Sequence, residues 1–535
     1  MALETETLRP EVYKALEDIV GPEHMTQEPA ILDSYNFVYG MELRYPKKFG
    51  TRPLAVILPG SSKEVQAIVK VCNRYGTKFK AHSTGFSPAA LQGDGPILSI
   101  DLRRMNRILQ IDEKNMYAVV EPYVTFGDLM NAAIKKGLRS YMINAGPLCS
   151  VLANSTNMNG FGTSNVSAGF ASRRVLAVEW VLPDGEKLRL GTLGTSGEWF
   201  CGDGPGIGLK GIMRGIIGPV GSLGVMTKVA IKLVPWYGPP KIKSFGKPPL
   251  YQAEIPESFK IFTVVFPSRD ILYEAFYLFQ EEGIAYLCSR QGPFTTTAAR
   301  TGSNKDVLAV WKTPEFQNKL KKLYHNMTIA LDASSPREMN YKVKCLEMIV
   351  NKLGGEFLQE DHNELTAKFL HGFNGLGAVK RVFRSTGGMA SNPSAGDSLD
   401  AVKKAHEMGA QIKEKYAKKG VLLDDGDPTW VTLLEDMGGH METPVRYNPN
   451  NPVSTKGALE FLEETGRELV NQKLGISEFE GGLRRGAVVH EEAGPKCLNY
   501  HTWMKKIKKA FDPEMVGDSR YYPSDKEIMT VNVEK

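Results

Sequence analysis

The sequence predicts an α+β protein with two main parts, and three observations carry this prediction. Residues 53–81 alternate strand, helix and strand patterns, as in a βαβ unit. Residues 175–190 have the pattern of a β-hairpin closed by a Pro-Asp-Gly turn. From about residue 260 the pattern favours helices on one face of an antiparallel sheet. We expect a first domain at 1–239 with its core at 49–236, a second domain at 240–480, and a C-terminal segment at 481–535 that returns to the first.

The first βαβ unit has clear start and stop signals. Residues 54–58 are an apolar run followed by Pro-Gly, which suits a buried strand. Ser61 and Glu64 form a capping-box pair at the start of a helix, and Gly76 marks its end. Residues 77–81 then predict a second strand.

Further elements follow in order along the first part. Strands are expected at 96–101 and 117–121, and a helix is expected at 125–136. Residues 138–172 are almost free of charge and rich in Gly, Asn, Ser and Thr, so they must be fixed by something that uses their backbone amides. Residues 225–234 predict a strand that ends at a proline.

The second part shows a different texture. Strands are expected at 260–266 and 327–332, and helices are expected at 270–282 and 337–352. This order gives a cap domain in which helices cover an antiparallel sheet.

Composition excludes several classes of protein. The chain has 535 residues, of which 42% are hydrophobic and 24% charged, and its net charge is +6, spread along the chain, so we expect no nucleic-acid partner. No apolar run is long enough to span a membrane and the first residues are acidic, so we expect a cytoplasmic protein. The six cysteines include no Cys-x-x-Cys pair, which argues against zinc ribbons and ferredoxin-type iron–sulfur clusters.

Glycine-rich loops carry the first functional signal. The run Gly206-Ile-Gly208-Leu-Lys-Gly211 matches the sequence pattern of dinucleotide-binding loops. However, no apolar strand precedes it, and no acidic residue lies between Asp203 and Glu254. We therefore reject NAD binding at this run. Small residues also gather at 83–87, 148–162 and 202–224. Unhindered backbone N–H groups are what a pyrophosphate needs, so three such loops predict a large phosphorylated cofactor.

A set of motifs lies in order along residues 53–235, and one further motif of the set lies near the C-terminus. Its members are Pro53–Pro59, the loop 82–87, Leu98–Leu102, Ala118–Pro122, Asn154–Gly162, Glu179–Gly185, Gly221–Thr227, Lys232–Pro235 and Lys508–Pro513. This set resembles the FAD-binding domain of the p-cresol methylhydroxylase/vanillyl-alcohol oxidase superfamily, which includes D-lactate and glycolate dehydrogenases. The resemblance implies a PCMH-type FAD-binding domain built of two subdomains, together with an α+β cap domain.

The resemblance also implies which residues meet FAD. The pyrophosphate is expected on the loops at 83–87 and 152–162, with Gly221–Val225 near the adenine or the flavin. The expected cofactor-binding residues are His82, Ser83, Thr84, Gly85, Phe86, Ser87, Pro147, Leu148, Ala153, Asn154, Ser155, Asn159, Gly160, Gly162, Thr163, Gly221, Gly224 and Val225. Phe86 stands where some members carry a flavin-linking histidine, and Cys149 is expected to be a packed thiol, so we expect non-covalent FAD.

Candidate catalytic residues come from the second part and the tail. The resemblance implies that Arg384 holds a substrate carboxylate, and that His440 and His490 act beside Glu442 and Glu491. A histidine next to a carboxylate can serve as general base or can ligate a metal. The expected catalytic residues are His490, Glu491, His440, Arg384 and Tyr521, and a divalent metal on His440, Glu442 and His490 is left open.

We therefore expect an FAD-dependent dehydrogenase that oxidises a hydroxylated small molecule, first of all a 2-hydroxy acid, by hydride transfer to flavin N5. Electrons are expected to pass to a separate flavoprotein or iron–sulfur protein, and a homo-oligomer is left open. Two alternatives remain: an aryl-alcohol or alkylphenol oxidase, and a non-catalytic FAD subunit that relays electrons. The phenol-oxidising branch is disfavoured because residues 163–178 contain no Asp or Glu.

Overall fold

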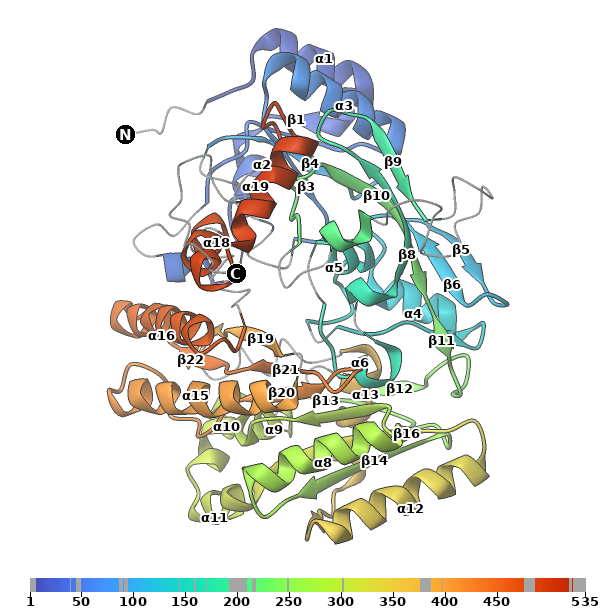
Figure 1. Cartoon of the computed structure of the whole chain (residues 1–535), viewed down its shortest axis with the longest axis vertical. Coiled ribbons are helices and arrows are strands. Elements are labelled where there is room, and N and C mark those ends of the chain that lie inside the picture. Colours follow the sequence, from blue (N-terminus) through green and yellow to red (C-terminus); the bar gives the residue numbers. More distant parts are fainter. Residues whose placement is uncertain are drawn as a thin grey trace.

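The computed structural model arranges the chain in two lobes, which we call the N-terminal lobe and the cap lobe (Figure 1). The structure describes residues 6–38, 40–44, 50–85, 90, 95–143, 145–157, 160–169, 171–191, 209–213, 218–247, 250–300, 303–375, 386–396, 398–475, 486–518 and 522. The N-terminal lobe holds two main sheets, of four and five strands, and the cap lobe is built on one sheet of seven strands.

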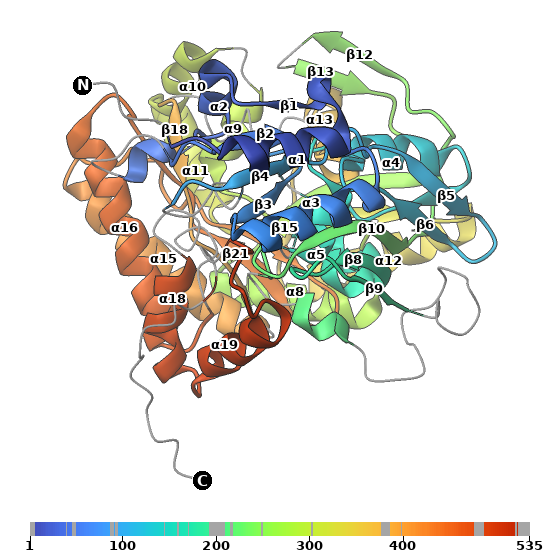
Figure 2. The ribbon, with the colours of Figure 1, turned by 90° about the horizontal axis from the view of Figure 1, so that it is seen from above.

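The first sheet of the N-terminal lobe contains the predicted βαβ unit. Its strands are ordered β1 (Met25–Thr26), β2 (Ala55–Ile57), β4 (Leu98–Asp101) and β3 (Phe79–His82), and the last three are parallel. Helices α1 (Pro10–Val20) and α3 (Ser62–Tyr75) lie over this sheet (Figure 2). The Ser61 side chain accepts a hydrogen bond from Glu64 N at the start of α3, and Gly76 ends the helix at φ 63°. The predicted Ser61 cap and the stop at Gly76 are therefore confirmed, whereas the Glu64 carboxylate accepts from Gly60 N and not from the backbone of Ser61.

The second sheet is fully antiparallel, in the order β5 (Ile108–Asp112), β6 (Tyr117–Val120), β10 (Val225–Lys232), β8 (Val175–Val181) and β9 (Lys187–Leu190). The predicted hairpin is β8–β9. Strand β5 is not among the predicted strands, since its side chains are mostly half-buried or exposed and form no apolar pattern. Helices α4 (Phe126–Ile134) and α5 (Val151–Thr156) share the core of this sheet.

The cap sheet has seven strands that pair antiparallel throughout. Their order is β17 (Glu356–Phe357), β14 (Phe259–Val265), β16 (Asn326–Asp332), β15 (Leu287–Arg290), β20 (Trp430–Leu433), β21 (Gly439–Glu442) and β19 (Pro393–Gly396). One face packs against α8 (Arg269–Glu282), α12 (Pro336–Lys352) and α15 (Leu399–Lys418) in a single apolar core. Helix α13 (His362–Asn374) packs with the core of the N-terminal lobe.

A polar row crosses the cap sheet on the face opposite that apolar core. Register pairing aligns Thr263, Thr328, Ser289, Thr432 and His440 on five neighbouring strands, and all five side chains are buried. Because alternate residues of a strand face opposite sides, the side chains between them, such as Val264, Ile329 and Val431, enter the apolar core.

Both ends of the chain tie distant parts together. Near the start, Leu43 of the short helix η2 (Met41–Arg44) is fully buried in the apolar core of the cap, and Glu42 accepts a hydrogen bond from Tyr447 Oη. Near the end, helix α19 (Tyr500–Phe511) leads to residues that pair with β3: Phe79 N donates to Val516 O over 2.9 Å, and Asp518 N donates to Phe79 O over 3.0 Å. No helix among the described residues is long and apolar enough to cross a membrane.

Candidate functional site

Three loops of the N-terminal lobe meet at one place. The first follows β3, the second runs through α5, and the third precedes β10. Ser150 N of the second loop donates to Thr84 Oγ1 of the first over 3.2 Å. Asn157 joins the second loop to the third: its carbonyl accepts from Gly218 N over 3.0 Å, and its Oδ1 accepts from Gly221 N over 3.4 Å. Segments up to 137 residues apart therefore form one surface of small residues and backbone amides.

The first loop starts at His82, whose ring is held at the end of β3. His82 Nδ1 lies 3.7 Å from Asp101 Oδ2, and the ring packs edge-on against Tyr35 at 5.1 Å. Tyr35 Oη donates to the same Asp101 oxygen over 2.6 Å. Burial lowers the pKa of His82, so the neutral ring is favoured. Within the described residues, buried His82 Nδ1 has no hydrogen-bond partner.

The second loop is fixed by Ser150 at the start of α5. Ser150 Oγ accepts from Ala153 N over 3.0 Å and donates to Pro122 O over 2.6 Å. After the helix, a Cβ at Gly162 would lie 1.7 Å from Met142 O, so only glycine lets the backbone pass there. Cys149, just before α5, is buried, and burial raises the pKa of its thiol to about 12.

The other expected cofactor residues fall as follows. Gly224 directly precedes the central strand β10, which begins at Val225, and Thr163 is buried. The side chain of Leu148 is strongly exposed. Three of the expected cofactor-binding residues, Phe86, Ser87 and Asn159, lie outside the residues that the structure describes. The structure describes the others, which are His82, Ser83, Thr84, Gly85, Pro147, Leu148, Ala153, Asn154, Ser155, Gly160, Gly162, Thr163, Gly221, Gly224 and Val225.

The cap lobe contributes a histidine–carboxylate pair. His440 and Glu442 are two residues apart on β21, so both face away from the apolar core of the cap. His440 Nε2 lies 3.1 Å from Glu442 Oε1, and Ser391 Oγ donates to Glu442 Oε2 over 2.8 Å. The side chain of His440 is 1% exposed, whereas that of Glu442 is 27% exposed. Glu442 is thus the accessible member of the pair, and His440 and Ser391 fix its carboxylate.

The pair lies against the second loop of the N-terminal lobe. The ring of Phe161 stacks on His440 with centroids 4.3 Å apart and planes at 14°. Trp430, on the neighbouring strand, meets His440 edge-on at 4.9 Å. These contacts place the His440–Glu442 pair beside residues 160–163.

Of the remaining expected catalytic residues, the structure describes His490 and Glu491, and it places them on a different element from the pair. His490 lies on α18 (Gly486–Ala493), where its Nδ1 is 2.7 Å from Tyr500 Oη. Burial, with a smaller effect of His501, lowers the pKa of His490 to about 4. Glu491 follows it on α18, and no described contact joins either residue to His440 or Glu442. Arg384 and Tyr521 lie outside the described residues, and in the described part of the chain no three or more His, Cys, Asp or Glu side chains are placed to hold a metal ion.

Sequence reasoning missed several residues of this site. It named Glu442 as the carboxylate beside His440 and as a possible metal ligand, not as the base, and it did not name Phe161, Ser391 or Trp430. One signal was present: His440 and Glu442 alternate within a short strand, which predicts a shared face. The partners Phe161 and Ser391 come from elements that no local pattern relates to β21.

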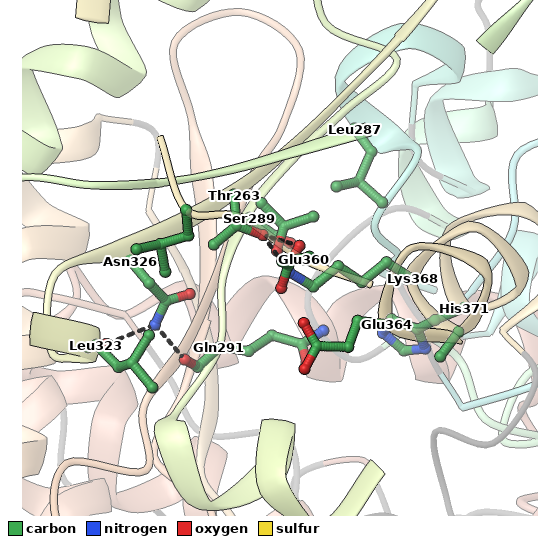
Figure 3. Close-up of a pocket in the computed structure, with 13 residues that line it drawn as sticks. Thr263, Leu287, Ser289, Gln291, Leu323, Asn326, Glu360, Glu364, Lys368 and His371 are labelled. Atoms are coloured by element: carbon green, nitrogen blue, oxygen red, sulfur yellow. Dashed lines mark hydrogen bonds and ion pairs between the residues drawn. The ribbon is translucent and has the colours of Figure 1, made fainter. Parts of the chain in front are cut away.

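A small polar pocket lies on the same side of the cap sheet, between the sheet and α13 (Figure 3). Lys368 Nζ contacts Glu360 Oε1 at 2.7 Å, and Thr263 Oγ1 donates to Glu360 Oε2 over 2.8 Å. Thr263 and Ser289 of the polar row line the pocket, together with His371. The row therefore runs from this pocket to His440.

Comparison with known proteins agrees with this geometry. Residues 53–191 match the FAD binding domain family, FAD_binding_4. This part of the chain is an FAD-binding domain. The three converging loops suit a polar dinucleotide, and the match at 53–191 agrees with the expected FAD-binding domain.

Individual relatives match over less than half of the chain. An uncharacterized FAD-linked oxidoreductase of Mycobacterium tuberculosis is 31% identical over 227 residues, which are 42% of this chain and 46% of the relative. Glycolate oxidase subunit GlcD of Bacillus subtilis is 26% identical over 227 residues, 42% of this chain and 45% of the relative. The chain thus spans less than half the length of these curated relatives.

The fold as a whole has solved counterparts. A structure of p-cresol methylhydroxylase with substrate bound has a TM-score of 0.76 and 18% identity, and the match covers 97% of this FAD-binding chain and 98% of the other. The α+β fold class, with a PCMH-type FAD-binding domain and an antiparallel cap sheet, is confirmed.

Proposed function

We propose that this chain is an FAD-dependent oxidoreductase that oxidises the CH–OH group of a small hydroxylated substrate, with a 2-hydroxy acid as the preferred class. The carrying observation is the carboxylate of Glu442. It is fixed by His440 and Ser391, it remains partly exposed, and it lies beside the second cofactor loop through the Phe161–His440 stack.

Bound FAD would supply the acceptor for the hydride that leaves the substrate carbon. Glu442 would receive the hydroxyl proton as general base. Its Oε1 faces His440 Nε2, which we assign as the N–H donor, so the imidazole stabilises the carboxylate and fixes its direction. The buried ring of His440 is held between Phe161 and Trp430, and this packing keeps the base in one orientation.

Two observations support the 2-hydroxy acid class. The matched relative from Bacillus subtilis is named a glycolate oxidase subunit, and glycolate is a 2-hydroxy acid. Residues 163–178, which follow the second loop, contain no Asp or Glu. In the phenol-oxidising branch of the superfamily that the sequence resembles, an acidic residue is expected there. We propose that Arg384 holds the substrate carboxylate and that FAD is bound non-covalently.

A second candidate, oxidation of an alkylphenol or aryl alcohol, is favoured by the near-complete fold match to p-cresol methylhydroxylase. In either case the reduced flavin would pass its electrons to a separate acceptor protein. The described residues contain no cluster of cysteines that could hold an iron–sulfur centre in the chain itself.

Anaerobic reduction tests this proposal. FAD-loaded protein is mixed with glycolate, D-lactate, L-lactate or D-2-hydroxyglutarate, and in parallel with 4-ethylphenol or vanillyl alcohol, while the oxidised flavin absorbance is followed. Bleaching by one of the acids is expected. Bleaching only by the phenolic compounds would replace the acid class with the second candidate, and no bleaching by any compound would favour an electron-relay subunit.

A further inference from the structure

The C-terminal segment 508–518 lies directly under two of the three cofactor loops. Lys508 Nζ donates to the carbonyl oxygen of Ser222, in the third loop, over 2.5 Å. Ser222 Oγ in turn donates to Asp518 O over 2.5 Å. The third loop is thus bonded through both its backbone and its side chain to residues almost 300 positions away.

The same segment is bonded to β3, the strand that carries the first loop. Residues 516 and 518 exchange backbone hydrogen bonds with Phe79, and they extend the parallel sheet by one bridge. Lys80 Nζ lies 3.3 Å from Asp518 Oδ2, and both side chains are buried. Lys80 also contacts the third loop, since a Cβ at Gly221 would lie 3.2 Å from Lys80 Cγ.

The charges in this segment are buried and well bonded. All three N–H bonds of the Lys508 ammonium have acceptors, namely Ser222 O, Asp512 Oδ2 and Gly517 O. The Asp512 carboxylate also accepts from Val516 N and Gly517 N over 3.0 and 2.8 Å. A buried charge pair of this kind fixes its neighbours, because moving any partner leaves a charge without compensation.

Glycine is required where the segment passes the third loop. A Cβ at Gly517 would lie 2.7 Å from Ser222 O, 3.1 Å from Asp512 Oδ2 and 3.2 Å from Lys508 Nζ. The backbone at Gly517 therefore packs against the third loop with no room for a side chain, so a displacement of the segment displaces the loop.

We infer that residues 508–518 are a cofactor clamp: Lys508, Asp512 and Gly517 are positioning residues that hold the first and third loops in the geometry that retains FAD. This inference rests on FAD binding in the proposed function. The FAD-binding match at 53–191 ends before the third loop and far before the clamp, so the clamp adds a part of the site that the match does not contain.

The test measures FAD affinity of the full chain. Apoprotein of wild type and of Lys508→Met is titrated with FAD, and binding is followed by quenching of flavin fluorescence. We expect the dissociation constant of Lys508→Met to rise about tenfold, because loops that are no longer held in the binding geometry must be ordered when FAD binds. The thermal unfolding midpoint of each apoprotein is measured as well, because it shows whether a loss of FAD affinity comes from a loss of folding.

Lys413→Met is the matched control. Lys413 is equally buried, lies 2.6 Å from Asp425 and donates to Gly426 O over 2.8 Å, but it belongs to the cap helix α15. It should lower the thermal midpoint and leave the FAD dissociation constant unchanged. Equal effects of Lys508→Met and Lys413→Met on FAD affinity would overturn the clamp.

Milder variants keep the test decisive if Lys508→Met does not fold. The double variant Lys508→Met with Asp512→Asn removes both charges of the pair, so neither is left unpaired. Gly517→Ala keeps every charge, but its Cβ would lie 2.7 Å from Ser222 O and would displace the third loop. Both should weaken FAD binding. Unchanged affinity in a folded double variant and in Gly517→Ala would refute the clamp alone, whereas a wild-type chain that takes up no FAD would refute the proposed function and the clamp together.

Discussion

The ring of Phe161 lies almost parallel to the imidazole of His440, although the two residues come from different lobes and are 279 positions apart. Phe161 belongs to the second cofactor loop, after α5, and His440 belongs to the cap sheet. The stack therefore sets the distance between the cofactor loops and the proposed base, Glu442.

Phe161→Leu should disturb this distance while it keeps most of the apolar volume. An aromatic pair contributes about 0.5–1.5 kcal/mol beyond its buried area, so we expect a loss of about 1 kcal/mol in the free energy of unfolding. Flavin reduction by substrate should slow about tenfold, because small misplacements of a catalytic group are costly. Phe369→Leu, which removes a stack on Phe373 within α13, should cost similar stability and leave the reduction rate unchanged.

Glu442→Gln should remove the base and keep the hydrogen bond from Ser391. We expect flavin reduction to slow by about 10²–10⁴-fold, which is the usual contribution of general base catalysis. FAD affinity should stay the same. Glu464→Gln changes a carboxylate that is also held by a hydroxyl, that of Tyr416, but on the outer helices of the cap. If the two variants reduce at the same rate in a stopped-flow experiment, Glu442 is not the base.

His490 should make the protein acid-sensitive. Its pKa is about 4 in the folded chain, against about 6.5 in the unfolded chain, so the unfolded state binds a proton more readily between these values. The stability from the neutral ring is complete above pH 6.5 and is lost as the pH falls toward 4, by about 3 kcal/mol in total. Thermal midpoints between pH 7 and pH 4 should fall less steeply in His490→Gln than in wild type. His362→Gln, at an exposed histidine of α13, is the control for replacing a surface histidine by glutamine.

Cys149 should not hold the flavin covalently. Burial raises the pKa of its thiol to about 12, so the nucleophilic thiolate is scarce at neutral pH. Acid precipitation of the loaded protein should leave the yellow flavin in the supernatant, and Cys149→Ala should carry as much FAD as wild type. Flavin that stays with the pellet in wild type and not in Cys149→Ala would contradict this expectation.

Much of the fold was predictable because its signals are local. The capping pair Ser61 and Glu64, the stop at Gly76 and the hairpin at 175–190 each depend on residues within one or two turns of chain. Strand β5 escaped prediction because edge strands with half-exposed side chains lack an apolar alternation.

The candidate site was predictable only in part. Small residues mark the three loops in the sequence, and the structure brings these loops together through Ser150 and Asn157. The motif Lys508–Pro513 was assigned to the FAD-binding domain from the sequence, but its contacts with the loops were not predictable. Ser391 and Phe161 were not predictable either, since their roles depend on contacts between elements far apart in the chain. No periodicity within one element encodes such contacts.

Leu43 gives the molecule a property that its sequence match conceals. This side chain fills the core of the cap, although residues 55–57, a few positions later, form a strand of the N-terminal lobe. A shortened protein that begins at Pro53 would leave an apolar hole in the cap large enough for a leucine, and it would lack the Glu42 anchor for Tyr447. Such a protein should aggregate when it is expressed. Fusion partners and tags should therefore be placed before Pro10 and not at residue 53, where the FAD-binding match begins.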